Sequence, residues 1–319
     1  MANMRQDAWR LICRRLVQVL PALLLATLLA FGLLKLVPGD IAVTLAGDNA
    51  SDQRILEIRQ LYGLDKPFLV QYLDWLWKVV HGDLSRSLLT GEAVLVAIER
   101  CLPATLLVVA MAMVIALLIG APLGVLAASR QGGWIDSAVM AISSLGVAVP
   151  SFWLAMLLIS GFAMERSWFP VSGAVPFLEN PWSALHHAFL PAVALAAGGV
   201  AEISRQLRGT LIELLSSQQV RTLHAKGLAP SVILWKHGLR NVGINLLTVV
   251  ALLANRMLAA TVVIEAVFAI PGMGGLIVNA ALQRDFPIVQ GVILVMVGIV
   301  LLINLATDML YGLIDPRVR

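Results

Sequence analysis

Long apolar runs that carry no charged residue dominate the chain. Five such runs are evident, and a sixth is interrupted only by Arg256; in chain order they cover residues 16–34, 101–129, 137–164, 180–201, 241–264 and 286–307. A helix that crosses a bilayer needs about 20 mostly apolar residues, because each residue adds about 1.5 Å across about 30 Å of hydrocarbon. The pattern predicts an all-α membrane protein with six transmembrane helices, at roughly 15–37, 103–128, 137–163, 188–210, 242–265 and 287–312.

A weaker apolar run over 266–283 is not counted as a span. Pro271, Gly272, Gly274 and Gly275 lie near its start. Residues of this kind interrupt a helix, and irregular backbone at membrane depth is tolerated only where protein or water covers it. We therefore expect a turn or a re-entrant loop here, and seven spans remain the alternative count.

Residues 38–102 form an external segment between the first two spans. Ser51 can cap a short helix that ends at Gly63, and Pro67 suits the first turn of a second helix. Apolar side chains then recur at three- and four-residue spacing, at Phe68, Tyr72, Trp75, Leu76 and Val79. Such an aromatic amphipathic helix fits either the membrane–water interface or the side of the transmembrane bundle, and the pattern leaves both open.

The segment over 211–241, between the fourth and fifth spans, is too polar to cross a bilayer and too apolar for a flexible linker. Val220, Leu223 and Leu228 form a stripe at loose helical spacing, and Gly227 and Pro230 close it. The pattern predicts a short helix beneath the membrane, with one side available to a soluble partner.

Composition and charge agree with this architecture. The chain of 319 residues is 59% hydrophobic and 13% charged, whereas soluble domains carry about 45–50% apolar and roughly 25% charged residues. With the amino terminus inside, the inner face receives 13 basic and six acidic residues, and the outer face nine basic and 13 acidic. This asymmetry is the positive-inside pattern, so the pI of 9.4 needs no nucleic acid partner. It predicts cytoplasmic termini, at 1–14 and 313–319, and it separates Cys13 from Cys101 across the membrane.

Motifs of enzyme chemistry are absent from the sequence. It holds no GxxxxGK[ST], HExxH, GxSxG or CxxC, and no metal site is predicted. Neighbouring side chains on a helix point about 100° apart, so the pair His186 and His187 favours packing over metal binding. The fourth span is expected to begin after this pair.

Arg256, beside Asn255, is the one charged residue deep within a predicted span. Because a charge at that depth is costly, both residues are candidates for lining a solute path. The alternative is that Arg256 snorkels outward or donates to carbonyl groups of neighbouring helices. Ion-coupled carriers usually place acids in mid-membrane, and here the acids lie at span ends. A transporter without its own energy source is expected to be driven by a partner protein.

The segment VRTLHAKGLAPSVILWKHGLRN resembles the coupling loop of binding-protein-dependent ABC importer permeases, within the dipeptide/oligopeptide/nickel group (B-type subunit). The resemblance covers essentially the whole chain. It includes RRLVQVLP with LVPGD, YGLDKPFLVQYLDWL, GDLSRSL, LPATL, VPSFWL, VIEAVFAIPGMGGL, RDFPIVQG and LYGLIDPRVR. Arg256 departs from the group, whose fifth span is usually small and apolar here; this departure implies either an unusual cargo or pairing with an acid on a partner.

The resemblance implies a type I permease in the bacterial inner membrane, with no catalysis of its own. Its expected partners are a second homologous permease, two ATPase subunits that bind ATP and Mg, and a periplasmic solute-binding protein that delivers a di- or oligopeptide. Nickel or another small solute is the alternative cargo, and a self-contained carrier or channel is a remote alternative. The residues expected to couple to the ATPases are Arg221, Thr222, Leu223, Ala225, Lys226 and Gly227.

Overall fold

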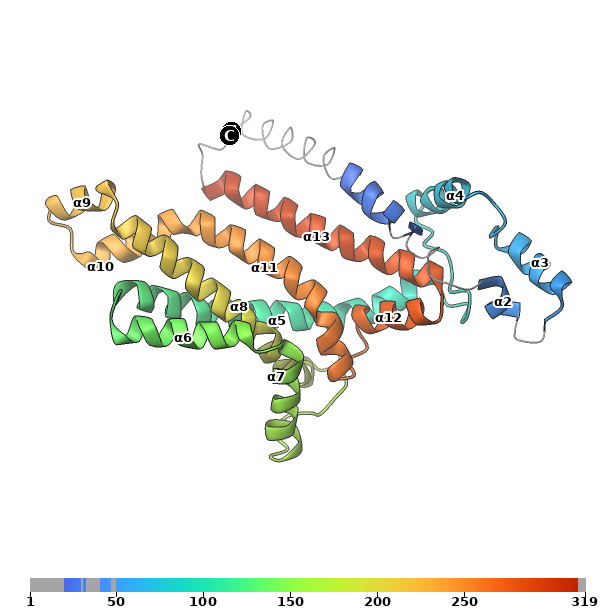
Figure 1. Ribbon diagram of the computed structural model, residues 1–319, viewed down its shortest axis with the longest axis horizontal. Helices are drawn as coiled ribbons and strands as arrows, with labels where there is room; N and C mark the ends of the chain where they lie inside the picture. The colour runs from blue at the N-terminus through green and yellow to red at the C-terminus, as the bar shows by residue number, and fades with distance from the viewer. Residues whose placement is uncertain (1–19, 30, 33–40, 47–49, 315–319) are drawn as a thin grey trace. The chain divides into compact units, whose positions relative to one another are not determined.

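The computed structural model describes residues 20–29, 31–32, 41–46 and 50–314, and these ranges contain helices and no β-strand (Figure 1). The predicted cytoplasmic amino terminus over 1–14, with Cys13, lies outside the described residues, as do 315–319. An apolar helix covers Leu20–Leu29. The further elements are α2 (Ile41–Ala46), α3 (Asp52–Leu61), α4 (Phe68–Val80), α5 (Val94–Ser129), α6 (Trp134–Ala148), α7 (Ser151–Leu158), the π-helix η1 (Ile159–Met164), α8 (Pro181–Leu215), α9 (Gln218–Ala225), α10 (Pro230–Val232), the π-helix η2 (Ile233–Gly238), α11 (Leu239–Val267), α12 (Met273–Leu282) and α13 (Phe286–Ile314).

Four helices are long and apolar enough to cross a membrane: α5, α8, α11 and α13. A fifth candidate is the pair Trp134–Ala148 and Ser151–Met164, which is bent by 96°. The expectation of one unbroken helix over 137–163 is therefore wrong. Pro150 explains the break, because proline forces the preceding Val149 out of the helical region, and Val149 has ψ 120°. The described part of the first predicted span, Leu20–Leu29, is shorter than a bilayer needs, so the count of six spans stays a prediction.

The fourth candidate span begins earlier than expected. Asn180 caps α8 by accepting a hydrogen bond from the Ser183 N–H at 3.0 Å, and Pro181 occupies its first turn. His186 and His187 therefore lie inside the helix. Their ring nitrogens are 2.8 Å from the Trp168 and Ser183 carbonyl oxygens respectively. These contacts agree with the packing interpretation of the pair.

The chain divides into two compact units, 1–102 with 275–301 and 103–274 with 302–319. In the first unit, the apolar face of α4 packs on the helix of Leu20–Leu29 and on α13. Phe31, Tyr72 and Trp75 form its buried centre, and the Tyr72 hydroxyl lies 3.0 Å from the Thr27 hydroxyl. Of the two alternatives for this aromatic helix, the structure adopts packing against other helices.

In the second unit, α8 is the central helix, and it contacts α6, α7 and α11 (Figure 1). α5 approaches α8 closely at Gly120 and Gly124, which are one turn apart. A Cβ at Gly120 would lie 2.9 Å from the Val200 carbonyl oxygen, and one at Gly124 would lie 2.8 Å from that of Ser204. Small residues spaced in this way let two membrane helices pack backbone to backbone.

Replacement of Gly124 by alanine should separate α5 from α8, because the new methyl group would overlap the Ser204 carbonyl. We expect Gly124→Ala to destabilise the protein by about 1–3 kcal/mol, measured as a lower thermal midpoint of the detergent-purified protein. Gly209→Ala on α8 is the matched control, because a Cβ there meets nothing within 4 Å. A control that lowers the midpoint as much as Gly124→Ala would contradict the packing argument.

Candidate functional site

The helix predicted beneath the membrane is α9. Its first turn is capped by Ser217, whose side chain accepts a hydrogen bond from the Val220 N–H at 3.4 Å. At its end, Gly227 has φ +78°, a left-handed conformation that favours glycine. The Gly227 N–H donates to the His224 carbonyl at 2.9 Å, and the Leu228 N–H donates to that of Leu223 at 3.3 Å. This is a Schellman ending, and it stops the helix sharply.

The residues expected to couple to an ATPase lie along this helix and its end. Val220 is the buried residue of α9, at 3% exposure, and Leu223 is half-buried. The others are exposed, namely Arg221, Thr222, Ala225, Lys226 and Gly227. The Thr222 hydroxyl donates to the Gln218 carbonyl within the helix at 3.0 Å. α9 therefore packs through Val220 and part of Leu223 and presents a basic surface.

Two contacts hold together the helices that precede and follow α9. Leu207, Leu211 and Val242 join α5, α8 and α11 in one buried cluster. Beside it, Arg208 of α8 donates two hydrogen bonds to the Asp136 carboxylate of α6, at 2.5 and 2.7 Å. A two-pronged contact of this kind fixes orientation as well as distance. From the sequence, Asp136 and Arg208 were only two charges expected on the same side of the membrane, because they lie 72 positions apart in the chain.

Arg256 pairs with Glu202. The Arg256 guanidinium of α11 donates to the Glu202 carboxylate of α8, and the two side chains are 60% and 28% exposed. From the sequence, pairing of Arg256 was expected only with an acid on a partner protein. The available signal for Glu202 was its place in a polar stripe of α8, four residues after Gly198 and four before Gln206. A charge pair inside two candidate spans is more tolerable at membrane depth than a lone arginine.

Asn255, the second predicted path residue, points to a different helix. Its amide group donates to the Asn304 side chain of α13 at 3.1 Å. Its own Oδ1 is buried and has no hydrogen-bond partner within the residues that the structure describes. The structure thus joins Asn255 to α13 and Arg256 to α8, and it does not bring the two side chains to one contact.

The exposed faces of the spans differ in polarity. On α5 the exposed side chains between Arg100 and Ser129 are apolar, among them Leu106, Val114 and Leu118. On α8 the exposed or half-exposed positions of one stripe are polar or glycine: Gly198, Glu202, Arg205, Gln206 and Gly209. A polar stripe on a membrane helix faces water or other protein, because lipid cannot hydrogen-bond to it. The stripe of α8 with Glu202 is therefore a face that lipid does not cover.

A second carboxylate lies buried where the sequence placed a span end. Glu265, at 1% exposure, accepts from the Thr105 hydroxyl at 2.5 Å and from the Gly274 N–H at 2.8 Å, at the first turn of α12. Thr105 in turn accepts from the Met273 N–H at 2.9 Å. The motifs LPATL and VIEAVFAIPGMGGL thus meet in one network. A Cβ at Gly272 would overlap the Glu265 carboxylate, which explains the glycine.

The break between α11 and α12 agrees with the expected turn over 266–283. The first helix ends at Val267, Ala269 has φ 47°, and the short apolar helix Met273–Leu282 follows. Across the described ranges, no three His, Cys, Asp or Glu side chains gather closely enough to hold a metal ion.

Comparison with known proteins identifies the family of the chain. Residues 120–319 match the family described as binding-protein-dependent transport system inner membrane component, and residues 8–109 match the amino-terminal region of such components. The chain is 40% identical over 309 residues to a Brucella abortus protein named as a peptide transport system permease, covering 97% of this chain and 98% of that one. It is 35% identical over 311 residues to the oligopeptide transport system permease protein AppB of Bacillus subtilis, with the same coverage of both chains.

The fold has solved counterparts as well. Inward-facing structures of the MetNI methionine ABC transporter match with TM-scores of 0.58 and 0.54, at 18% and 21% identity. Each alignment covers 69% of this chain, and 96% and 97% respectively of the solved chain. The fold is that of an ABC importer permease. The chain belongs to the family of binding-protein-dependent transport system inner membrane components, in the peptide/nickel group.

The Glu202–Arg256 pair should respond asymmetrically to loss of either charge. Glu202→Gln leaves an arginine that cannot lose its proton, whereas Arg256→Gln leaves a carboxylate that can gain one. We expect Glu202→Gln to destabilise the protein by roughly 1–3 kcal/mol. This loss is smaller than the loss on breaking a fully buried ion pair, because Arg256 is partly exposed. Arg256→Gln should cost less, and the double variant should recover most of the loss. Thermal midpoints of the three purified variants measure this order; equal losses in both single variants would refute it.

Proposed function

We propose that this chain is the permease subunit of an ATP-driven importer and forms half of the path for a di- or oligopeptide. Membership of the family supports the role of a transport permease. The names of relatives, such as the oligopeptide permease AppB, support a peptide as the cargo. Nickel or another small solute is the alternative cargo within the same group. The observation that carries the proposal is α9, a sharply ended basic helix that buries Val220 and part of Leu223.

The proposed role of α9 is to dock into a cleft of an ATPase subunit. Arg221, Lys226 and Gly227 are exposed for that contact, and Thr222, Leu223 and Ala225 complete the surface. A helix that moves with its ATPase must also transmit that movement to the membrane-spanning helices. The Arg208–Asp136 pair and the cluster around Leu211 connect the end of α8 to α6, α5 and α11, so displacement of α9 reaches all of these spans.

The remaining members of the assembly follow from this role. A second, related permease would complete the path, two ATPase subunits would bind ATP and Mg, and a periplasmic solute-binding protein would deliver the cargo. The chain itself would be non-catalytic. We place both termini and the 211–241 loop in the cytoplasm and the 38–102 segment outside, because the inner face then carries the excess of basic residues.

The path itself is proposed to run along the polar stripe of α8 and its neighbour α11. Glu202 and Arg256 contribute opposite charges there, whereas the Asn255 amide is directed to Asn304 of α13 and its Oδ1 is buried, so Asn255 is left out of the proposed path. A zwitterionic peptide would meet complementary charge in a passage that lipid does not enter. A self-contained carrier or channel would need no ATPase; purification in mild detergent separates the two ideas, since an ABC permease should bring its ATPase subunits with it.

Coupling is tested at Gly227. Gly227→Val in the complete complex should abolish most solute uptake in proteoliposomes and uncouple ATPase stimulation, because a branched residue resists the φ of +78° that ends α9. Gly91→Val is the matched control, since Gly91 lies in the 38–102 segment, has φ +72°, and a Cβ at either glycine meets nothing within 4 Å. If Gly227→Val keeps the uptake of the wild type, or if both variants lose it equally, α9 is not the coupling element.

The path assignment is tested at Arg256. Arg256→Ala should reduce uptake of a radiolabelled peptide by about tenfold or more, because one charged hydrogen bond to the solute is worth roughly 1.5–3 kcal/mol. Assembly should persist, which co-purification of the partner subunits measures. Arg54→Ala, on the exposed surface of α3, is the control. Uptake at the wild-type rate by Arg256→Ala would remove Arg256 from the path.

A further inference from the structure

The segment that joins α9 to α11 has an exposed face that neither the coupling helix nor the proposed path uses. α10 and η2 follow α9 and continue into α11 (Figure 1). On one side this segment packs on the spans: η2 contacts α8 and α11, Ile233 is 1% exposed, and Leu234 packs against the buried cluster around Leu211. The packing of this side leaves the opposite side of the segment exposed.

The exposed side carries Val232, Trp235 and Lys236, which we call the Trp235 face. Val232 and Trp235 are 40% and 63% exposed, and Lys236 is exposed as well. Side chains three and four positions apart lie on one side of a helix, so these three project together. The ion pairs found among the described residues do not include Lys236. An apolar ring thus lies beside a lysine whose charge no acid of the described ranges neutralises.

The place of Trp235 in the chain puts it close to the bilayer surface. It precedes the candidate span Val242–Val267 by seven positions, which is about 10 Å along a helix. The headgroup region extends about 5–8 Å beyond the hydrocarbon on each side, so the indole can reach it. Tryptophan is enriched at this level, because its ring is apolar and its N–H can hydrogen-bond to headgroups or water. A soluble ATPase subunit docks beyond the headgroups, which makes lipid the closer partner for this face.

The charge of the surrounding loop favours an anionic lipid. Residues 214–241 contain four basic side chains and no acidic one; the basic residues are Arg221, Lys226, Lys236 and Arg240. Clusters of this size directly before a membrane helix, on its cytoplasmic side, bind anionic headgroups. The aliphatic stem of a lysine can lie along apolar surface while its ammonium reaches a phosphate. Trp235 and Lys236 therefore match the two parts of a phospholipid, its acyl chains and its charged headgroup.

We propose that the Trp235 face binds an anionic phospholipid of the inner leaflet. The Lys236 ammonium donates to the lipid phosphate, and the Trp235 ring and Val232 contact the upper part of the acyl chains. This inference rests on the proposed function for the cytoplasmic position of the 211–241 loop. Because α10 and η2 join α9 to α11, the lipid holds this end of the loop at the bilayer surface while α9 moves with its ATPase.

The test uses the complete permease complex in vesicles of phosphatidylcholine and phosphatidylglycerol in equal amounts, with bromine on the acyl chains of one lipid or the other. Bromine quenches tryptophan fluorescence on contact, and the signal of the wild type minus that of Trp235→Phe reports Trp235 alone. We expect brominated phosphatidylglycerol to quench Trp235 more strongly than brominated phosphatidylcholine does. Lys236→Gln, measured against its own Trp235→Phe counterpart, should lower this preference about fivefold, because it removes one cation at the surface. Added salt should also lower the preference.

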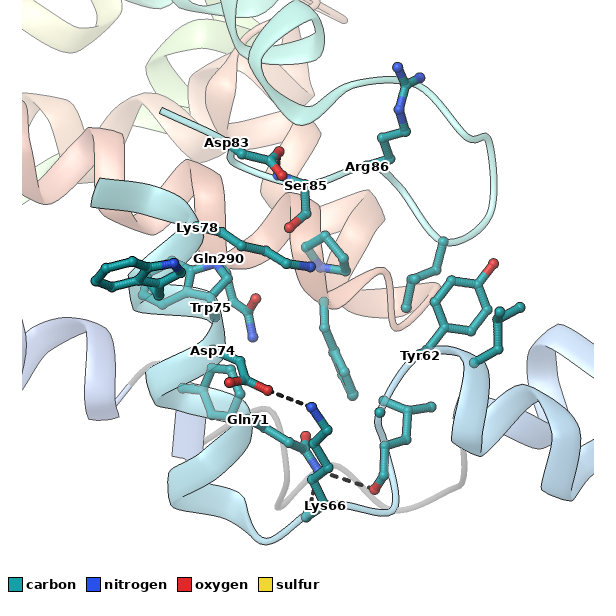
Figure 2. A pocket seen from close by; sticks show the side chains of 18 of the residues that line it. Tyr62, Lys66, Gln71, Asp74, Trp75, Lys78, Asp83, Ser85, Arg86 and Gln290 are labelled. Atoms are coloured by element: carbon teal, nitrogen blue, oxygen red, sulfur yellow. Dashed lines mark hydrogen bonds and ion pairs between the residues drawn. The ribbon is translucent and has the colours of Figure 1, made fainter. Parts of the chain in front are cut away.

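Lys78→Gln is the matched control. Lys78 is also an exposed lysine beside an exposed tryptophan, Trp77, but Asp74 precedes it by one turn of α4 and Asp83 lies in the following loop (Figure 2). These acids oppose binding of an anionic headgroup, so Lys78→Gln should keep the lipid preference of the wild type.

Equal quenching of Trp235 by the two lipids overturns the proposal, as does a loss of preference in Lys78→Gln equal to that in Lys236→Gln. No quenching by either lipid also overturns it, because Trp235 would then contact a partner subunit. Trp235 and Lys236 are both exposed, so neither substitution removes buried packing. The measurement needs no ATP, binding protein or cargo; failure of the wild-type complex to take up peptide would instead refute the proposed function.

Discussion

The close contact between α5 and α8 is the interaction on which the second unit depends. Gly120 and Gly124 leave no side chain between the two backbones, so α5 lies directly against the Val200 and Ser204 carbonyl groups. Helices in a bilayer gain little from burying apolar surface, since lipid is equally apolar, and close van der Waals packing takes its place. With α8 held in this way, α6, α7 and α11 pack around it. α8 then leads into α9, so this packing also positions the segment that is proposed to couple to the ATPase subunits.

Polar side chains in the spans are also constrained by the lipid around them. Water is absent, so each polar group must find its partner within protein or beside a hydrated face. Ser143 and Ser204 form a buried hydrogen bond at 2.7 Å between α6 and α8. Glu202 meets Arg256, and Glu265 caps α12 with the help of Thr105. These contacts select one arrangement of the helices, because a shift by one turn would leave each group unpaired at membrane depth.

The external segment is free of this constraint, because water can hydrogen-bond to its exposed polar groups. Asp285, before α13, accepts from the Ser87 hydroxyl and from the Leu88 N–H, which holds the loop after α4 against the first turn of that helix. The motifs GDLSRSL and RDFPIVQG, nearly 200 positions apart, are joined by this contact.

The sequence by itself determined the class of protein, the candidate spans, the Pro/Gly break before α12 and the short helix α9. It did so because apolar length, helix caps and positive-φ glycines are local signals. Ser51, Ser217 and Gly227 act within a few residues of their own positions. Pro150 and the Asn180 cap are local signals as well, but the apolar runs continue past them and hid the bend at Val149 and the start of α8 at Pro181. The tertiary structure alone decided which charges pair between helices. Arg256 could be located at membrane depth from the sequence, but Glu202 became its partner only when α8 packed beside α11. An ion pair depends on a distance in space, which a separation of 54 positions along the chain does not encode.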